Sequence, residues 1–406
     1  MRVGIVGGGI TGLALAHALA CRGRDFVLFE KSGHWGGAIR TEFTNGRVAE
    51  FGPQRMRLTA SVRRLVHDLG LGSQVVAAAP KAETFILSKE GMRSFSDLIP
   101  MLNRRPDPPE SPETRLGAWL RHTCGDAAYR GLVGPVVAAT FASDPDEMLR
   151  RPVLPLVEEM LAGLIARGSA PPAFTFRDGL SVLPGALAAR YREFLRPGTA
   201  VGAIRRADDC LEIQAGEGPG EVVDRVVLTG SARDMAPLLA EVAPAAAARL
   251  ARLRYNTIRI VALDTEGCPP GFGYRTALDM PLRTQGVTWN ASVFAGDGDT
   301  GREGICTAFL GGLTDTDVAS WPDERVGRVA AREFEQVHGF GAEPLAVASA
   351  SLPAWDTSWA AIEGGLELPE DVTLASTCAE RLAISSRIAR AGTLARDLSA
   401  RSDAEP

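Results

Sequence analysis

Paired cysteines and clustered histidines are missing from this sequence of 406 residues. The six cysteines are Cys21, Cys124, Cys210, Cys268, Cys306 and Cys378. None forms a C-x-x-C pair, and the five histidines are equally dispersed. A disulfide framework or a zinc site needs such residues at close and regular spacing. The sequence therefore indicates reduced thiols and no metal.

An excess of positive charge and long apolar runs are missing as well. The formal net charge is −5, which gives no field to attract nucleic acid or an anionic membrane. No apolar run approaches the ~20 residues that a membrane-spanning helix needs. A strand pattern begins at residue 2, which leaves no room for a signal peptide. We therefore expect a cytoplasmic protein without stable membrane insertion, and two domains, because the chain exceeds a single typical core.

Lysine is scarce. Only Lys31, Lys81 and Lys89 are lysines, and the other residues among the 44 basic ones are arginines. No lysine occurs after Lys89. A planar guanidinium does not replace a compact ammonium as a group that holds a water molecule. We therefore do not expect a reaction in which a lysine from the chain after Lys89 holds a water molecule.

The first 31 residues carry the strongest motif. Residues 2–6 form a short run rich in β-branched residues, typical of a buried parallel strand. The run meets Gly7-Gly8-Gly9-Ile10-Thr11-Gly12, and an apolar helix pattern continues over residues 13–20. A second short strand, residues 26–29, ends in Glu30. This order is the βαβ fingerprint of a dinucleotide-binding domain.

Each residue of the fingerprint has a physical role. Gly7 permits the tight turn, Gly9 lets the backbone approach a pyrophosphate, and Gly12 allows the helix to pack closely on the strand. The helix N-terminus offers its free N–H groups to the phosphates. Glu30 follows Gly12 by 18 residues, where a carboxylate can accept both ribose hydroxyls. The stretch predicts a nucleotide cofactor.

The rest of the chain predicts a split domain. Strands are expected at residues 85–87, 92–95, 201–204, 210–214, 222–229, 257–263, 287–293, 305–310 and 372–375, and helices at residues 61–69, 116–165 with a break at 142–145, 323–338 and 384–398. The middle section has no glycine-rich phosphate motif, whereas the strands after residue 201 and the late strand and helix resume the first pattern. The expected fold class is α/β, with a discontinuous Rossmann-type domain of residues 1–80, 190–265 and 350–406. An inserted α+β substrate-binding domain takes residues 81–189 and 266–349.

Five further segments carry a family resemblance. They are GGAIR at residues 36–40, EFGPQ at 50–54, PVVAATFASDPDE at 135–147, residues 176–187, and residues 289–294 followed by 307–312. In this order they resemble segments of the flavin amine oxidase superfamily, specifically of its protoporphyrinogen oxidase branch, over nearly the whole length. The resemblance implies a split Rossmann-type FAD-binding domain and noncovalent FAD. It also implies a hydride taken from a reduced cyclic small-molecule substrate, with oxygen or another electron acceptor at the end.

The resemblance also implies site residues, position by position. The cofactor-binding residues are Gly7, Gly8, Gly9, Ile10, Thr11 and Gly12 for the pyrophosphate, Glu30 for the ribose, Lys31, Gly37, Ala38 and Arg40 for the next stretch, Gly52, Pro53, Gln54 and Arg55 beside the ring, Val201 for adenine, and Trp359, Leu382, Ala383 and Ile384 at the closing positions. No acid–base pair can be chosen. The candidates that face the substrate are Gln54, Arg57 and Trp359, and Trp355 and Trp359 fit core packing equally well.

Two departures keep other functions open. The closing segment, residues 376–388, lacks the glycines usual in the family. Where the family places an arginine before an aromatic residue to pair a substrate carboxylate, this chain has Thr84-Phe85, and Gln54 follows Gly52-Pro53 where Arg or Asn is common. Arg55, Arg57 and Arg93 are near enough in sequence to take over the pairing. The alternatives are a flavin dehydrogenase of specialised metabolism, a flavin amine oxidase, and a non-catalytic FAD- or NAD-binding module.

Overall fold

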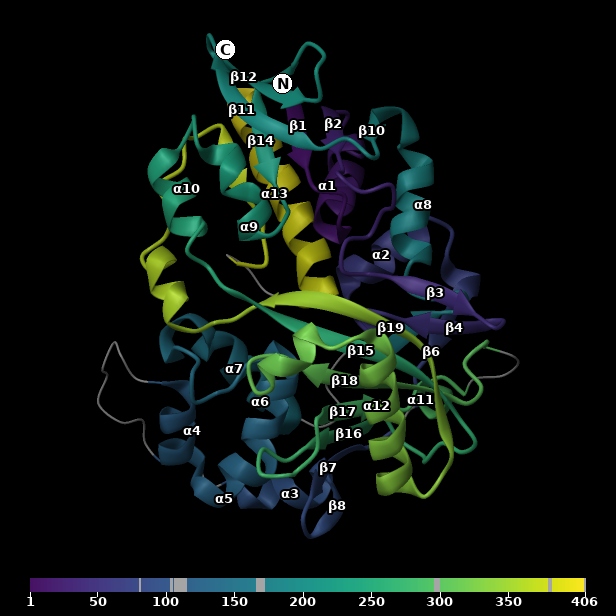
Figure 1. Ribbon diagram of the computed structural model, residues 1–406. Coiled ribbons are helices and arrows are strands. Elements are labelled where there is room, and N and C mark those ends of the chain that lie inside the picture. The colour runs from purple at the N-terminus through teal and green to yellow at the C-terminus, as the bar shows by residue number, and fades with distance from the viewer. Residues whose placement is uncertain are drawn as a thin grey trace.

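The computed structural model describes residues 1–79, 82–102, 105, 115–165, 172–295, 300–378 and 382–404. The chain forms an upper half around a parallel sheet and a lower half around a larger mixed sheet (Figure 1). Two long strands, β15 (Tyr255–Thr265) and β19 (Ala342–Pro353), pair along their length where the halves meet.

A five-stranded sheet forms the centre of the upper half. Its order is β10-β2-β1-β14-β20, and all neighbours are parallel. The strands are β1 (Arg2–Val6), β2 (Asp25–Phe29), β10 (Leu195–Arg196), β14 (Arg225–Leu228) and β20 (Val372–Leu374). β1 lies in the middle because its residues are apolar on both faces, and Val3 and Ile5 have no exposed surface. The predicted first two strands are confirmed.

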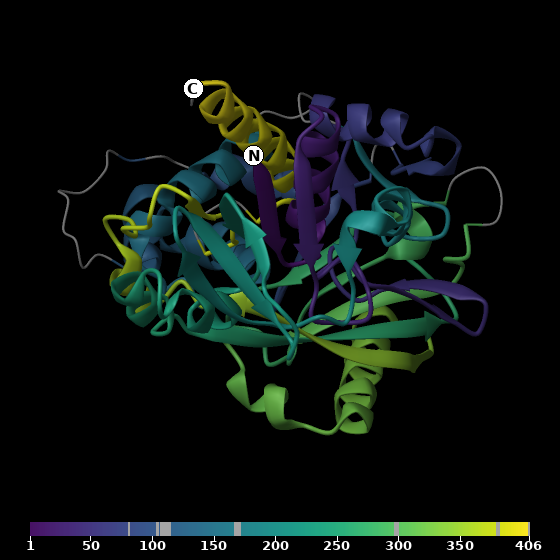
Figure 2. The ribbon, with the colours of Figure 1, turned by 90° about the horizontal axis from the view of Figure 1, so that it is seen from above.

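Helices cover one face of this sheet, and a second sheet covers the other (Figure 2). The helices are α1 (Ile10–Ala20), α2 (Ala60–Asp68), α8 (Val182–Arg190) and α13 (Ile384–Ala404). The second sheet has antiparallel strands β11 (Val201–Ala207), β12 (Cys210–Ala215) and β13 (Glu221–Val223), and the short helices α9 (Ala232–Met235) and α10 (Pro244–Leu250) follow β14. A Cβ atom on Gly4 would lie 2.2 Å from Ile213, so the two sheets are in direct contact. The order of layers confirms the predicted Rossmann-type arrangement.

A seven-stranded sheet organises the lower half, in the order β19-β15-β18-β17-β16-β7-β8. Its other strands are β7 (Thr84–Ser88), β8 (Gly91–Ser94), β16 (Gly273–Thr276), β17 (Thr284–Thr288) and β18 (Ile305–Gly311). Helix α12 (Asp323–His338) packs its apolar side on this sheet through Val326, Ala330 and Phe334. The middle helices lie beside it in Figure 1: α3 (Phe95–Leu98), α4 (Leu116–Cys124), α5 (Asp126–Ala128), α6 (Gly134–Phe141) and α7 (Arg150–Ile165).

Two small sheets connect the halves. A hairpin of β3 (Thr41–Thr44) and β4 (Arg47–Glu50) turns at Asn45 and Gly46, both with positive φ. The strands β5 (Met56–Arg57), β9 (Ala173–Phe176) and β6 (Val75–Ala77) form the other. Strand β4 ends at Glu50 and strand β5 begins at Met56, so the two sheets fix the chain on either side of Gly52 and Pro53.

Two predicted strands are wrong in part. Residues 222–229 form two strands, because the chain changes sheet at Asp224, whose carboxylate accepts a hydrogen bond from the N–H of Arg2. The strand predicted at 287–293 ends at Thr288, and residues Asn290–Val293 form the short helix α11. The long strand β19 was not predicted, because small and polar residues leave it without an alternating apolar pattern.

Other expectations are confirmed. Helix α12 begins and ends at the predicted residues, and β7 and β8 form the predicted hairpin. The break at residues 142–145 coincides with Ala142, which has φ +49° at the end of α6. Within the described ranges, no helix combines the length and the apolar character that crossing a membrane requires.

Candidate functional site

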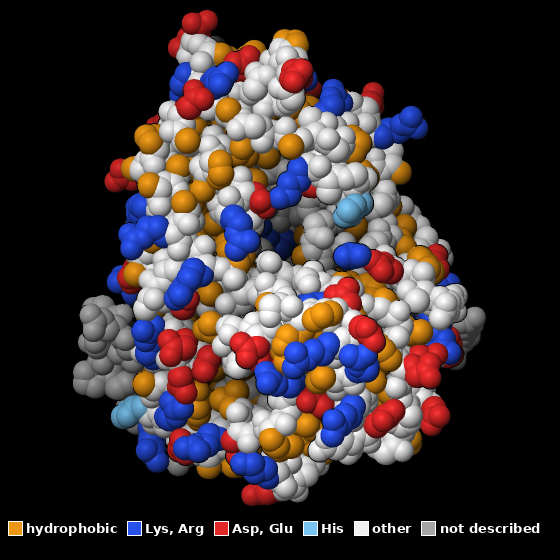
Figure 3. Space-filling view, viewed as in Figure 1, with side chains coloured by type: hydrophobic (Ala, Val, Ile, Leu, Met, Phe, Trp, Pro, Cys, Tyr) orange, Lys and Arg blue, Asp and Glu red, His pale blue; other side chains and the backbone are white. Residues whose placement is uncertain are grey.

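A cavity of about 600 Å³ lies at the carboxyl end of the parallel sheet. Its walls come from the β1–α1 turn, the end of β2, residues 36–39 and 199–202, the loop after β14, the ends of β15 and β19, and the start of α13. The molecule is hollowed between its upper and lower halves on the face drawn in Figure 3. Crevices at this edge of an open α/β sheet are the usual ligand sites of such folds.

The glycine-rich turn forms the floor of the cavity. Gly7 has φ +115° and donates its N–H to the carbonyl of Phe29 at 2.8 Å. A Cβ atom on Gly12 would lie 2.1 Å from the carbonyl oxygen of Gly7, so only glycine lets α1 pack there. Gly9 differs, since its backbone is extended (φ −71°) and its nearest potential contacts are 4.0 Å away. Its missing side chain therefore leaves space in the cavity and not between protein atoms.

Glu30 is held in place by backbone groups. One carboxylate oxygen accepts the N–H of Gly8 at 2.6 Å, and the other accepts the N–H and the hydroxyl of Ser32 at 2.8 and 2.7 Å. The side chain of Trp35 packs against Gly8, where a Cβ atom would lie 2.5 Å from the ring. The carboxylate is thus oriented at the rim of the cavity, with lone pairs left for a ligand.

A second glycine-rich loop lies on the first. The N–H of Gly36 donates to the carbonyl of Gly8 at 2.9 Å, and a Cβ atom on Gly37 would lie 3.1 Å from the Cα atom of Gly9. A Cβ atom on Gly52 would lie only 1.9 Å from the carbonyl oxygen of Ala38. Three segments that are far apart in the sequence therefore approach at backbone contact, and glycine is required at each approach.

Twelve of the expected cofactor-binding residues line the cavity. They are Gly7, Gly9, Ile10, Thr11, Glu30, Lys31, Gly37, Ala38, Pro53, Val201, Leu382 and Ile384. Three expected residues have other surroundings: Arg40 forms an ion pair with Glu42, the ring of Trp359 stacks on Trp355 at 4.0 Å beside a separate cavity of about 240 Å³, and Arg55 lies over the ring of Phe272. Gly8, Gly12, Gly52, Gln54 and Ala383 lie next to lining residues in the chain.

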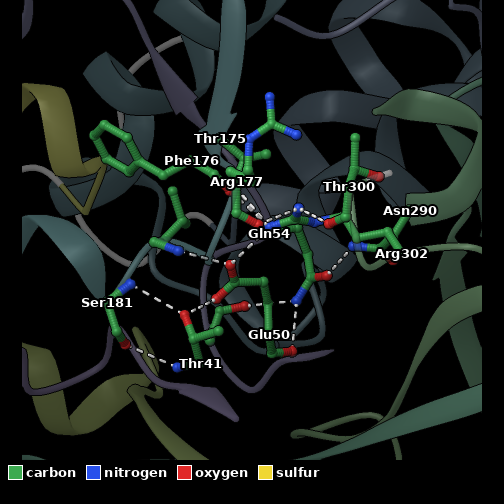
Figure 4. Close-up of polar contacts among 12 residues, drawn as sticks. Thr41, Glu50, Gln54, Thr175, Phe176, Arg177, Ser181, Asn290, Thr300 and Arg302 are labelled. Carbon is green, nitrogen blue, oxygen red and sulfur yellow. Dashed lines mark hydrogen bonds and ion pairs between the residues drawn. The ribbon is translucent and has the colours of Figure 1, made fainter. Parts of the chain in front are cut away.

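Gln54 is part of a buried hydrogen-bonded chain (Figure 4). Its side-chain amide donates to the carbonyls of Glu50 and Gly52 at 3.0 Å, and its oxygen accepts from the Asn290 amide at 2.8 Å. The Asn290 oxygen accepts in turn from the hydroxyl of Thr307 at 3.1 Å. This chain ties the segment after Gly52 to α11 and β18. Gln54 therefore acts on the cavity by positioning Pro53.

Glu50 and Arg302 form a second buried group in the same region (Figure 4). The Glu50 carboxylate accepts the N–H of Leu180 and the hydroxyl of Thr41, both at 2.8 Å, and lies 3.8 Å from Arg302. Arg302 donates to the carbonyls of Phe176, Arg177 and Thr300. Burial raises the pKa of Glu50 to about 7, although the hydrogen bonds and the charge of Arg302 oppose the rise.

Sequence reasoning missed two functional side chains. Arg387, which is 3% exposed, lines the cavity and donates to the hydroxyl of Thr11 at 2.9 Å and to the carbonyl of Ala375 at 2.6 Å. The hydroxyl of Thr229 donates to the carbonyl of Gly7 at 2.9 Å. The sequence did not indicate a role for Arg387, because an arginine in a helical pattern is normally solvated. The sequence could have indicated Thr229, because this residue directly follows the apolar strand that runs beside β1.

The lining offers groups that bind and orient. Among the described residues it contains neither histidine nor cysteine. Tyr255 also lines the cavity, and its hydroxyl accepts the N–H of Ala232 at 2.7 Å. Burial raises the pKa of Tyr255 to about 12, so it stays protonated near neutral pH. The described side chains therefore supply a site that can bind and orient a large polar ligand.

Comparison with known proteins identifies the ligand class. A family model described as NAD(P)-binding Rossmann-like domain matches residues 5–69, and one described as flavin containing amine oxidoreductase matches residues 101–364. The chain is 24% identical to protoporphyrinogen oxidase 1 of Spinacia oleracea, over 82% of this chain and 70% of that protein. It is 25% identical to coproporphyrinogen III oxidase of Propionibacterium freudenreichii subsp. freudenreichii, over 84% and 78%.

Solved structures share the fold. A crystal structure from Exiguobacterium sp. 255-15, provisionally described as a protoporphyrinogen oxidase, has a TM-score of 0.77 at 22% identity and covers 98% of this chain and 99% of its own. A variant of putrescine oxidase has a TM-score of 0.76 at 14% identity and covers 99% of both chains. These findings confirm the resemblance and the fold class expected from the sequence. The chain belongs to the family of flavin-containing amine oxidoreductases, and it is a flavin-dependent oxidoreductase.

Proposed function

We propose that the protein binds FAD noncovalently and takes a hydride from a reduced cyclic substrate of the porphyrinogen type, with oxygen or another acceptor reoxidising the cofactor. The observation that carries the proposal is the cavity, which runs from the glycine-rich turn and Glu30 to the start of α13. An extended dinucleotide has the right chemistry for a glycine floor, a ribose-binding carboxylate and a buried arginine. The division into the two domains given above remains part of this proposal.

The residues have distinct roles in this proposal. Gly9 leaves space for the pyrophosphate, and Arg387 supplies a buried positive charge beside Thr11. Glu30 holds the ribose, and Val201 meets the adenine through its backbone. The remaining lining residues and their neighbours in the chain serve the same cofactor: Gly7, Gly8, Ile10, Thr11, Gly12, Lys31, Gly37, Ala38, Gly52, Pro53, Gln54, Leu382, Ala383 and Ile384.

The chemistry divides between cofactor and protein. FAD, when bound, supplies the hydride acceptor. The protein holds the substrate against it and keeps water out, since Pro53, Leu382 and Ile384 contribute apolar walls. Noncovalent attachment is supported by the lining, whose described residues include no cysteine or histidine, and by Cys378, which is buried outside the lining.

The test has two stages. First, the purified protein should be yellow and release FAD into the supernatant on acid precipitation. Flavin that remains with the precipitated chain contradicts noncovalent binding, and a colourless protein that takes up no added FAD contradicts the cofactor. Second, the flavin-loaded enzyme should convert protoporphyrinogen or coproporphyrinogen III to the porphyrin, and Glu30→Ala should lower FAD affinity without changing the fold by circular dichroism.

One observation favours a second candidate, a flavin dehydrogenase of specialised metabolism. Thr84-Phe85 stands where relatives of the family carry an arginine, and both N–H groups of the Gln54 amide already donate to the carbonyls of Glu50 and Gly52. A flavin-loaded enzyme that is reduced by neither porphyrinogen, yet is reduced by another cyclic substrate, supports this alternative.

A further inference from the structure

Two of the six cysteines lie side by side in the lower half of the molecule. The thiol of Cys268, in the segment after β15, lies 3.8 Å from the thiol of Cys306 on β18, although the two residues are 38 apart in the sequence. Both thiols are free, and a disulfide would join the sulfur atoms at about 2.05 Å. The two thiols are thus placed to react with each other once one of them is oxidised.

The protein holds both thiols in place. Cys306 lies on a strand that is paired on both sides, with β15 and with β17, and its thiol also lies 3.8 Å from the hydroxyl of Thr265. The segment that carries Cys268 is attached to α11, because the N–H of Gly271 donates to the hydroxyl of Ser292 at 2.9 Å. The contact between the thiols is therefore fixed by the surrounding structure and not by two mobile side chains.

The two thiols differ in exposure and in acidity. Cys268 is half-buried, whereas Cys306 has no exposed surface. The hydrogen bond between the thiols lowers the pKa of Cys268, and the same bond together with burial raises the pKa of Cys306. The thiolate is the reactive form of cysteine, so Cys268 is the thiol that reacts first with a small oxidant. An accessible thiol with a second thiol beside it is the usual arrangement of redox-sensitive cysteines.

Packing is the alternative role for this pair. A buried cysteine often behaves as a small apolar side chain, and Cys306 belongs to the apolar cluster of the seven-stranded sheet. Packing explains Cys306 by itself. It does not explain why the half-buried Cys268 directs its sulfur to a second thiol.

We propose that Cys268 and Cys306 form a site of reversible oxidation, at which a hydroperoxide converts the two thiols to a disulfide. The Cys268 thiolate attacks one oxygen of hydrogen peroxide, the O–O bond breaks, and the leaving hydroxide takes up a proton to become water. The Cys306 thiol then attacks the sulfur of the Cys268 sulfenic acid, and a second water leaves as the S–S bond forms. The thiols lose two electrons and two protons, and one hydrogen peroxide becomes two molecules of water.

A peptide map after oxidation tests the site. The full chain is treated with hydrogen peroxide in small excess, the remaining thiols are alkylated, and the digest is analysed by mass spectrometry. We expect a peptide in which Cys268 is linked to Cys306, lighter than the sum of its two parts by about 2 Da for the two hydrogen atoms lost. Dithiothreitol added before alkylation should abolish the linked peptide. Because the oxidant is added, this site and the proposed function can fail independently.

Cys306→Ala separates the two steps of the reaction. Without the second thiol, oxidation should stop at the sulfenic acid of Cys268, which dimedone traps as an adduct that the unchanged protein does not accumulate. Cys210→Ser is the matched control. Cys210 is also half-buried, but its thiol faces the carboxylate of Asp224 at 3.7 Å, so this variant should form the Cys268–Cys306 link like the unchanged protein. The map of the unchanged protein remains decisive even if Cys306→Ala does not fold.

Other results would overturn the inference. A Cys268 sulfenic acid that persists in the unchanged protein, or a disulfide between two chains on a non-reducing gel, would show that Cys306 does not resolve the oxidised thiol. Linkage by diamide but not by hydrogen peroxide would overturn the choice of a hydroperoxide. Absence of the link with either oxidant, in a protein that is folded by circular dichroism, would leave packing as the role of the pair.

Discussion

The missing side chain of Gly9 matters for cofactor binding and not for folding. Its backbone conformation is open to any amino acid, and the space around its Cβ position is empty of protein atoms. Gly12 has the opposite character, because a Cβ atom there would collide with the carbonyl of Gly7. Two glycines of one motif are thus required for different reasons.

Gly9→Val should therefore fold and lose the cofactor. We expect FAD affinity to fall by about 10- to 100-fold, since the added side chain occupies space needed by the ligand. Isothermal titration of apoprotein with FAD measures the loss. Gly185→Val on α8, where the Cβ position is also open, is the control and should bind normally. Gly12→Val should fail to fold, and equal FAD loss in a folded Gly12→Val protein would contradict the distinction.

Glu50 makes stability depend on pH. Its pKa rises from 4.5 to about 7 on folding, so the folded state binds the proton more tightly than the unfolded state. The stabilisation is complete below about pH 4.5 and is lost as the pH rises through about 7, with an upper limit of about 3 kcal/mol.

Glu50→Gln should flatten this dependence, because the amide keeps the shape and cannot ionise. Urea unfolding at pH 5, 6, 7 and 8 should show the free energy of unfolding of the unchanged protein falling with pH more steeply than that of the variant. Parallel curves would mean that Arg302 and the hydrogen bonds keep the carboxylate ionised throughout.

At the scale of elements, α11 is where local pattern and tertiary structure disagree. Residues 287–293 are rich in residues that favour strands, yet β17 ends at Thr288 and a helix begins at Asn290. The reason is the Asn290 side chain, which bonds to Gln54 on one side and to Thr307 on the other. In the short helix, the Asn290 amide meets Gln54 with its nitrogen and Thr307 with its oxygen.

Asn290→Leu should destabilise the protein by about 2 kcal/mol, because the buried Gln54 oxygen and Thr307 hydroxyl lose their partner. Thr307→Val alone should cost about 1 kcal/mol. The double variant should cost less than the sum, since the leucine and the valine then face each other without an unpaired hydroxyl. Strictly additive values from denaturant unfolding would show that Asn290 and Thr307 are not coupled.

The sequence predicted the elements that depend on local chemistry. The turn from Gly7 to Gly12, the acid at the end of β2 and the amphipathic helix α12 all follow from patterns within 20 residues. Contacts between distant segments were not predictable: Gln54 and Asn290 are 236 residues apart, and Arg387 meets Thr11 across 376. Buried arginines in particular look like solvated ones until the fold is known.

At the scale of the whole molecule, the shortage of lysine argues against amine oxidation. Lys31 pairs with Asp234 at 2.7 Å and Lys89 with Asp279 at 3.2 Å, so both ammonium groups are engaged in ion pairs. Those strands, where amine-oxidising relatives carry the lysine that holds a water, have none.

Simple amines should accordingly be poor substrates. With a porphyrinogen or another cyclic acid as reference, we expect kcat/KM for putrescine and benzylamine to be at least about 100-fold lower. Anaerobic flavin reduction in a stopped-flow instrument measures this without depending on the electron acceptor. Rapid reduction by either amine would assign the enzyme to the amine-oxidising members of the family.

The order of strands in the parallel sheet has a consequence for biosynthesis. The first strand made, β1, lies between β2 and β14, and β20 closes the sheet near the end of the chain. The wall of the cavity therefore contains both Val6, at the end of β1, and Arg387, on α13. A growing chain on the ribosome cannot complete this pocket before α13 emerges. A chain that stops before α13 therefore lacks part of the wall that would hold the flavin.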